Sequence, residues 1–274
     1  MKTQVIENRI FNSQHDIGEG GDMIFFSGPH SPDNPYKHDD FEHLIVRNCI
    51  LDLRSVPLAQ QDEAISGVCG ANVEMHHTLV IGAKKAMLCG NGDWPEQDRA
   101  HGEWLINGCV FINCGRRCPE AQDGVRVTMR NSWVHDWGYP PFSVRAFGAW
   151  ARTGASIIAE NCLFTQSAFF RLPFKEFFDD VGGHFGEAWN DRPSKLRDYL
   201  LPGLCRGLTA ARGAHVEATS CYTNKRWIRL ENSRSPIDRR AAGVLVGMFQ
   251  QHLHPEYERV LGCSLDQLFK DVAK

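Results

Sequence analysis

The stretch INCGRRCPE, residues 112–120, places two adjacent arginines between two cysteines. Cys114 and Cys118 have a spacing that suggests a metal or redox site. A structural zinc site, however, needs four ligands, usually from two such cysteine pairs, and no second pair of similar spacing follows. A disulfide remains an alternative, but free cysteines most often pack as small apolar residues. Packing is the favoured interpretation, which leaves the chemistry of this stretch to Arg116 and Arg117.

Further basic residues gather in the same part of the chain. They are Arg116, Arg117, Arg126, Arg130, Arg145 and Arg152, with Lys84 and Lys85 earlier in the chain. Guanidinium groups bind carboxylates through two parallel hydrogen bonds. If the chain folds so that these charges converge, they predict a site for an acidic ligand. The alternative is scattered charge that only keeps the surface soluble.

Histidines and aromatic residues add weaker signals. His76 and His77 are adjacent in a stretch expected to be a strand, so their side chains would point to opposite faces, which disfavours a shared metal. We take His77 as a candidate for a ligand groove, with a solvated or core-edge histidine as the alternative. The aromatic residues Trp94, Trp137, Tyr139 and Trp150 can stack on sugar rings or serve only as structure.

Composition limits the possible partners. The formal net charge is −3 and 42% of the residues are hydrophobic, so a sizeable core is expected. A slightly acidic chain has no general attraction for nucleic acid or for an anionic membrane. The sequence shows no apolar run long enough for a membrane span and no secretory signal at Met1, so a soluble protein is expected.

A repeat organises the chain and must position these residues. Segments such as RNCILDL, NGCVFIN and ENCLFTQ share a polar residue, then a small residue, then apolar alternation. The small residues are Cys49, Thr78, Cys109, Ser132, Cys162 and Cys221, mostly spaced by roughly 30 residues. Short β-type runs lie between them, so each copy predicts two or three strands joined by polar turns.

This period predicts an all-β fold, a right-handed parallel β-helix in which each copy is one coil. The small residues would then stack inside the solenoid. We expect one domain over residues 1–274. Within it, residues 168–205 have helix-like apolar spacing and predict a helical insertion. Residues 235–274 predict a helical C-terminal segment with Ser264 as an N-cap, which could cap the terminal coil.

The part of the chain from Asp62 to Trp137 resembles the central part of the pectate lyases. The stretches that carry the resemblance are DEAISGVCGANVEMHHTLVIGAKKAMLCGNGD and WLINGCVFINCGRRCPEAQDGVRVTMRNSWVHDW. The order and spacing are nearly those of the family, in which an Asp-His-x-Lys segment precedes an Arg-x-Pro rung. The resemblance independently implies a right-handed parallel β-helix and a lyase that acts on uronic-acid polymers.

The resemblance also implies residue roles. Arg117 falls on the arginine that the family uses as catalytic base, and Lys85 falls on the lysine that contacts the substrate carboxylate. Asp62 falls on a carboxylate that binds calcium. The chain departs from the pattern at three positions: Ser66 replaces a calcium carboxylate, Arg47 aligns with an aspartate, and Gln122 replaces a second arginine.

These departures argue against the usual calcium site, because calcium favours several carboxylates among its oxygen ligands. We therefore expect no cofactor, with Asp62 as a weak calcium candidate and Arg47 performing the role of the ion. This hypothesis fails if a chelator abolishes activity and calcium restores it.

The implied reaction is β-elimination. Cations would stabilise the charge that builds on the uronate carboxylate as the proton leaves C5. Because a free guanidinium has a pKa above about 12, an alkaline optimum is expected. The expected catalytic residues are Arg117 and Lys85, and the expected substrate-binding residues are Arg47, Arg116, Arg126, Arg145, Gln122, His77 and Trp137.

Two rival classes remain open. One is a β-helix hydrolase, which needs paired carboxylates such as Asp93 with Asp98 or Asp179 with Asp180. The other is a non-catalytic β-helix that binds acidic sugar. The expected partner is an acidic polysaccharide, either galacturonan-like or an N-acetylgalactosaminuronic acid capsular polymer of the Vi type, with no nucleic acid or membrane partner. A monomer that is periplasmic or secreted fits such a substrate.

Overall fold

The computed structural model describes residues 2–18, 21–27, 41–57, 60–68, 70–90, 102–115, 117–137, 147–166, 206–210, 213–224 and 237–272. In this part of the chain the strands form three sheets, and every strand pair within them is parallel. The predicted helical insertion, 168–205, lies outside the described residues.

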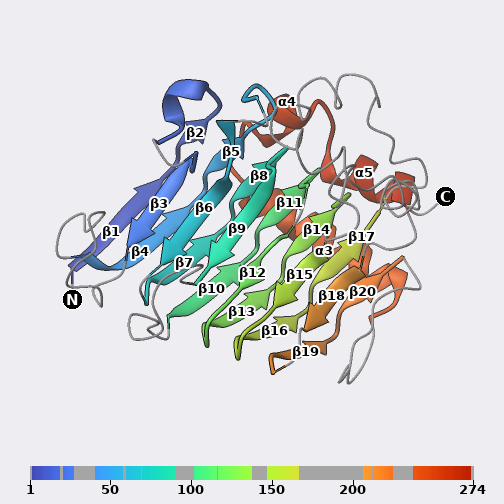
Figure 1. The fold of residues 1–274 in the computed structure, drawn as a ribbon. Helices are drawn as coiled ribbons and strands as arrows, with labels where there is room; N and C mark the ends of the chain where they lie inside the picture. The colour runs from blue at the N-terminus through green and yellow to red at the C-terminus, as the bar shows by residue number, and fades with distance from the viewer. Residues whose placement is uncertain are drawn as a thin grey trace, which may run out of the picture.

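The chain visits the three sheets in turn (Figure 1). Sheet A contains β1 (Lys2–Glu7), β4 (Phe41–Arg47), β7 (Asn72–His76), β10 (Glu103–Asn107), β13 (Arg126–Arg130), β16 (Ser156–Glu160) and β19 (His215–Thr219). Sheet B contains β2 (Ile10–Phe11), β5 (Ile50–Asp52), β8 (Leu79–Ile81), β11 (Val110–Ile112), β14 (Trp133–His135), β17 (Leu163–Thr165) and β20 (Tyr222–Thr223).

Sheet C contains β3 (Ile24–Ser27), β6 (Glu63–Val68), β9 (Lys85–Cys89), β12 (Glu120–Ala121), β15 (Phe147–Ala151) and β18 (Arg206–Ala210). A short 3-10 helix, η1 (Gln14–Asp16), lies between β2 and β3. Consecutive strands of one sheet belong to consecutive repeats, so residues roughly 30 positions apart become neighbours. The predicted all-β architecture with parallel strands is confirmed in this form.

The corner between sheets A and B explains the repeat seen in the sequence. Each strand of sheet A ends before a residue with left-handed backbone, including Asn48 (φ 51°), His77 (φ 48°) and Asn131 (φ 44°). Asparagine tolerates this conformation better than most residues. His77 is therefore a turn residue, and the prediction that His76 and His77 share one strand is wrong because β7 ends at His76.

The small residues that follow this corner form the predicted internal stack. Successive repeats are joined by backbone hydrogen bonds, such as Leu79 N to the Cys49 carbonyl at 2.9 Å and Val110 N to the Thr78 carbonyl at 3.0 Å. The Thr78 hydroxyl oxygen also accepts from Cys49 N. All members of the stack are buried. Small side chains are needed at this corner because two sheets meet there and leave little interior space.

Apolar side chains on both faces of sheet B explain the position of the C-terminal helices. Leu51, Val80 and Phe111 point into the core between the sheets. Their strand neighbours Leu79 and Val110 belong to a second apolar cluster outside the sheet, as expected when successive side chains alternate. This outer apolar face must be covered to be removed from water.

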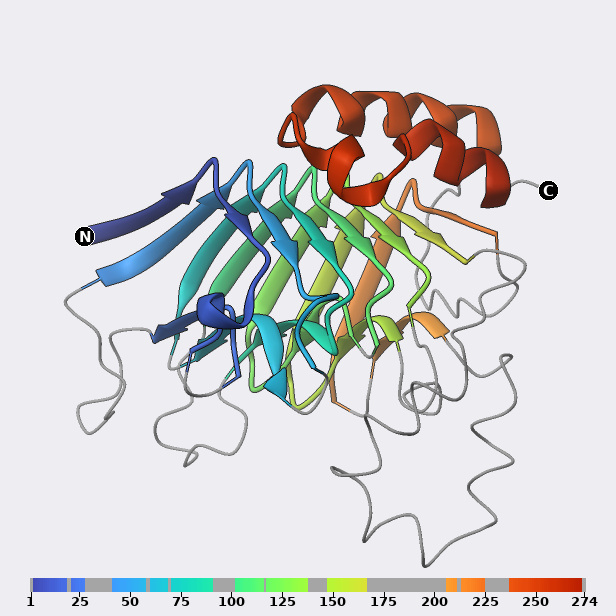
Figure 2. The same cartoon turned by 90° about the horizontal axis from the view of Figure 1, so that it is seen from above.

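The helices α3 (Arg239–His252), α4 (Tyr257–Leu261) and α5 (Leu265–Val272) supply this cover (Figure 2). Asp238 accepts a hydrogen bond from Ala241 N at the start of α3, and Ser264 accepts one from Gln267 N, as predicted for an N-cap. The helices lie along the flank of sheet B instead of closing the terminal coil, because the outer apolar face is on that flank. No helix in the described segments is long and apolar enough to span a bilayer.

Candidate functional site

Two of the predicted residues, Lys85 and Arg117, lie side by side near the N-terminal ends of the strands β9 and β12 of sheet C. Ala86 N donates a hydrogen bond to the Arg117 carbonyl at 3.0 Å, so Lys85 and Arg117 occupy adjacent rungs. Lys85 lies opposite Glu63 in the register of β6 and β9. The side chains of Lys85 and Arg117 are 17% and 12% exposed, respectively. Both cations are therefore largely shielded from water.

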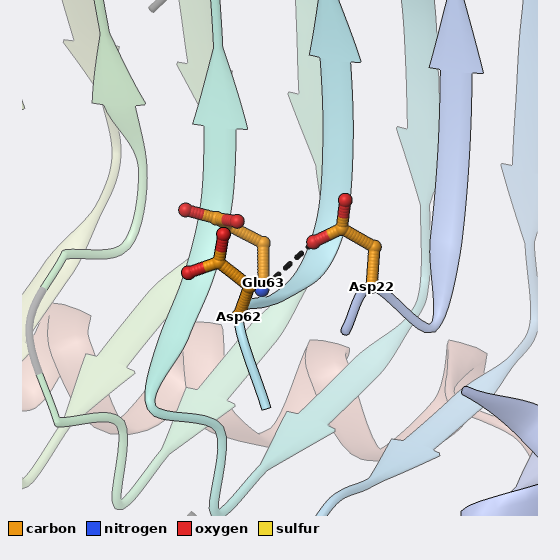
Figure 3. Close-up of side chains that lie close together, drawn as sticks. All are labelled: Asp22, Asp62 and Glu63. Carbon is orange, nitrogen blue, oxygen red and sulfur yellow. Dashed lines mark hydrogen bonds between the residues drawn. The ribbon is translucent and has the colours of Figure 1, made fainter. Parts of the chain in front are cut away.

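An acidic cluster surrounds the Lys85 ammonium. It consists of Asp22, Asp62 and Glu63, whose nearest carboxylate oxygens lie within 4.8 Å of one another (Figure 3). Lys85 Nζ lies 2.5 Å from Asp62 Oδ1 and forms an ion pair with Glu63. Asp22, from the segment before β3, accepts a hydrogen bond from Glu63 N at 2.9 Å. Among the described residues, three acids therefore meet the Lys85 ammonium.

This crowding of acids separates their pKa values. Burial raises the pKa of Glu63 to about 8, and the neighbouring Asp62 and Asp22 carboxylates add to the rise while Lys85 opposes it. Burial also raises the pKa of Asp22 to about 6. For Asp62, burial acts in the same direction, but Lys85, a hydrogen bond with Glu63 and the charge of Lys84 together lower the pKa. The cluster therefore contains an acid with a lowered pKa, Asp62, beside an acid with a raised pKa, Glu63.

A second charged group lies farther along sheet C. Glu120, with a side chain only 2% exposed, forms ion pairs with Arg117 and with Arg152, the latter at 3.1 Å. Gln122 donates its amide N–H to the same carboxylate. The Arg117 guanidinium lies over the Trp150 ring, with its carbon 4.1 Å from the ring centroid. Gln122, where the resemblance implies an arginine, thus contributes a hydrogen bond to this group.

The remaining predicted site residues lie elsewhere or outside the described part of the chain. Arg47 pairs with Glu7 on sheet A. Arg126, also on sheet A, lines a pocket of about 300 Å³. His77 stacks near His252 of α3, with ring centroids 4.9 Å apart.

Trp137 is fully buried in the core, where it cannot stack on a sugar. Arg116 and Arg145 lie outside the described residues, as do Trp94, Tyr139 and the acids Asp93, Asp98, Asp179 and Asp180. The structure therefore brings together Lys85, Arg117, Gln122 and Asp62. It does not bring Arg47 beside Lys85, so Arg47 does not perform the role of the calcium ion there.

The cysteines of the INCGRRCPE stretch pack in the core. Cys114 and Cys118 are buried and free. Burial raises the pKa of the Cys118 thiol, with a further rise from its contact with Cys114. The favoured interpretation of these cysteines as packing residues agrees with this position.

The sequence missed Asp22, Glu63 and Glu120. Asp22 has no partner nearby in sequence, and only the pairing of β3 with β6 brings it to Asp62. The other two carried a signal that could have been used. Glu63 follows the aligned Asp62, and Glu120 follows the Arg-Cys-Pro segment directly.

The acidic cluster supplies three carboxylates of the kind that a calcium ion favours. Calcium takes about six to eight oxygen ligands, with a preference for carboxylates, and Asp22 and Glu63 compensate for the acids lost at Ser66 and Arg47. Burial is the main cause of the raised pKa values of Asp22 and Glu63, and the neighbouring carboxylates add to the rise. The residues therefore fit a divalent cation better than the sequence implied.

Comparison of the chain with protein-family models, with curated proteins and with solved structures found no match in any of the three.

Proposed function

We propose that the chain is a right-handed parallel β-helix that cleaves an acidic polysaccharide by β-elimination. The proposed site lies near the N-terminal ends of the strands of sheet C. The observation that carries the proposal is the position of Lys85 and Arg117 on adjacent rungs. The handedness follows from the general rule that crossovers between parallel strands of one sheet are right-handed. The substrate would be a uronic-acid polymer, galacturonan-like or N-acetylated, and such a substrate favours a periplasmic or secreted monomer.

In this reaction the uronate carboxylate binds next to the cations of the site. Lys85 and Arg152 neutralise the charge that develops on the carboxylate as the C5–H bond breaks. Arg117 in its neutral form takes the C5 proton. The electron pair of the C5–H bond forms a double bond between C4 and C5, the C4–O bond breaks, and the departing glycosidic oxygen takes up a proton from water. The products are an unsaturated uronate end and a new reducing end.

A divalent cation would be held by Asp22, Asp62 and Glu63, beside Lys85. When bound, it would supply additional positive charge for the substrate carboxylate. The chain's own contribution is to hold these acids together through the hydrogen bond from Glu63 N to Asp22. Lys85 is the counter-charge of the cluster in the absence of the ion.

One observation favours hydrolysis as a second candidate function. Glycoside hydrolases use two carboxyl groups, one protonated and one ionised. The raised pKa of Glu63 and the lowered pKa of Asp62 correspond to these two roles, and the two carboxyl groups belong to one cluster. The ion pairs of both acids with Lys85 oppose this reading, because they occupy the oxygens that a substrate would need.

Product analysis tests the proposal. The purified protein is incubated with a panel of uronic-acid polymers, with and without calcium, between pH 7 and an alkaline pH. Near-ultraviolet absorbance from an unsaturated uronate, together with new reducing ends, would support the lyase. New reducing ends without that absorbance would identify a hydrolase. Binding without either product would reduce the site to a receptor for acidic sugar.

A further inference from the structure

Glu120 is a buried carboxylate that faces two arginines from different rungs of sheet C. It lies in register with Leu88 of β9 and Trp150 of β15. Arg117, three residues earlier, and Arg152, on the next rung, both form ion pairs with it. A buried carboxylate is stable only with such partners. The ion pairs therefore balance the charge of the buried carboxylate and also hold the two guanidinium groups in place.

The Arg117 side chain is held from two directions. Glu120 contacts its Nη1 atom, and the Trp150 ring lies below the guanidinium plane at 4.1 Å. Arg152 approaches the same ring at 5.4 Å. A planar cation between a carboxylate and an aromatic face has one defined orientation. These contacts therefore hold a flexible side chain with five N–H donors in one geometry.

The charged groups that face Arg117 come from each neighbouring element. In its own repeat the acid is Glu120. In the next repeat the cation is Arg152, which directly follows β15. On β9 the cation is Lys85, which is paired with Asp62 and Glu63 behind it. Glu120 is an anion in direct contact with Arg117, so this carboxylate contributes to the balance of charge at the guanidinium.

We propose that Glu120 is a positioning residue that fixes the Arg117 guanidinium and retains its proton, so that elimination begins only at alkaline pH. This inference rests on the proposed lyase function. A hydrogen-bonded carboxylate favours the charged form of its partner, and an added cation such as Arg152 or Lys85 disfavours it. Glu120 therefore opposes the two neighbouring cations, and its removal leaves them to favour loss of the Arg117 proton.

The first experiment measures initial rates of unsaturated product against pH for the wild type, Glu120→Gln and Glu160→Gln. Glu160 is a matched control because it pairs with Arg130 on sheet A. The expected result for Glu120→Gln is a rising limb moved by about one to three pH units to lower pH. The control should keep the wild-type profile. A rising limb that does not move, at any overall rate, would overturn the proposal.

A second measurement does not need turnover. Nuclear magnetic resonance of ¹⁵N-arginine labelled protein reports whether the Arg117 guanidinium rotates, with Arg117→Lys used to assign its signals. Slow rotation in the wild type and fast rotation in Glu120→Gln are expected. Equal rotation in both proteins would overturn the positioning role even if the pH profile moved.

The two failures are distinguishable. If the wild type yields no unsaturated product from any polymer, the proposed function fails, and the guanidinium spectra alone decide whether Glu120 fixes Arg117. If product forms but neither the spectra nor the rising limb responds to Glu120→Gln, the lyase stands and the role of Glu120 fails. Thermal unfolding of each variant establishes that it is folded.

Discussion

At the residue scale, each cation of the candidate site is paired with an acid on its own or a neighbouring rung of sheet C. Lys85 pairs with Asp62 and Glu63, and Arg117 pairs with Glu120. These pairs are shielded from solvent, so their mutual attraction is less screened than that of surface pairs. The site therefore carries its own counter-charges, and a substrate carboxylate must compete with them.

Substitution of the proposed base tests the lyase at this scale. Arg117→Lys should lower kcat by about 10²- to 10⁴-fold, the usual contribution of a general base, because a lysine places its nitrogen differently and contacts Glu120 through one point. KM should change little. Steady-state kinetics on the best polymer measures both. Arg130→Lys, an exposed change on sheet A, is the control, and full activity in Arg117→Lys would remove Arg117 from the mechanism.

Calcium binding tests the acidic cluster. Calcium should raise the Tm of the wild type in a dose-dependent way, since a ligand at 100 times its Kd stabilises the folded state by about 2.7 kcal/mol. Asp62→Asn should lose most of this shift because it removes one carboxylate of the cluster. Differential scanning fluorimetry with calcium and with chelator measures it. An equal shift in wild type and Asp62→Asn would place the ion elsewhere.

At the element scale, one turn and one helix layer stand out. The corner between sheets A and B carries His77 where four other repeats have asparagine, and its ring contacts His252 of α3. Burial lowers the pKa of His77, and the neighbouring His252 and His76 lower it further. The folded protein therefore disfavours the protonated form of His77, whereas the unfolded chain does not.

This difference gives stability a defined pH dependence. Below the ordinary histidine value of 6.5, the unfolded state binds the proton that folded His77 rejects, so stability falls as pH drops from 7 to 5. His77→Asn keeps a residue suited to the left-handed turn and removes the titration. Its urea midpoint should fall less over this interval than that of the wild type. His215→Asn, at an exposed position of β19, is the control, and equal losses in all three proteins would contradict the prediction.

The helix layer can be tested through a buried aromatic side chain. Phe249 of α3 is 2% exposed and packs in the apolar cluster outside sheet B. Phe249→Ala should lower the free energy of unfolding by about 3 to 5 kcal/mol because it removes a buried ring and leaves a cavity. Met248→Ala on the same helix, where the side chain is 46% exposed, should change it by less than about 0.5 kcal/mol. Urea denaturation measures both, and a small effect of Phe249→Ala would show that the helices pack loosely.

At the scale of the whole molecule, the core runs through successive repeats without interruption in the described residues. Repeats contact their neighbours through parallel strand pairs in all three sheets, except that the last described repeat, β19 and β20, has no strand in sheet C. In such an arrangement, stability depends on the contacts between adjacent repeats. Cys49, Cys109 and Cys162 lie at equivalent corners of different repeats, so they report on each repeat separately.

Thiol labelling uses these cysteines as probes. In the native protein, Cys109 and Cys162 should resist alkylation, because both are fully buried and burial raises the pKa of each thiol. Cys263, which is only partly buried, should react much faster. In increasing urea, Cys49, Cys109 and Cys162 should become reactive at one midpoint if the repeats unfold together. Mass spectrometry of labelled peptides measures each site, and separate midpoints would show that repeats open independently.

The sequence alone predicted the parallel all-β architecture, the stack of small residues and the C-terminal helices. These features arise from local patterns: small residues at a regular period, apolar alternation, and capping residues such as Ser264. The same period placed Lys85 and Arg117 on adjacent rungs, because residues one repeat apart become neighbours in a parallel sheet.

Only the tertiary structure decided which acids meet these cations and which face the helices cover. Asp22 reaches Asp62 through the pairing of β3 with β6, and Arg152 reaches Glu120 through the pairing of β12 with β15. Arg47, in contrast, is carried to sheet A with Glu7. The side chains of one repeat are distributed over three sheets, so the order of charged residues in the sequence does not determine which of them meet at the site. The spatial register between repeats determines this, and that register depends on every turn along the chain.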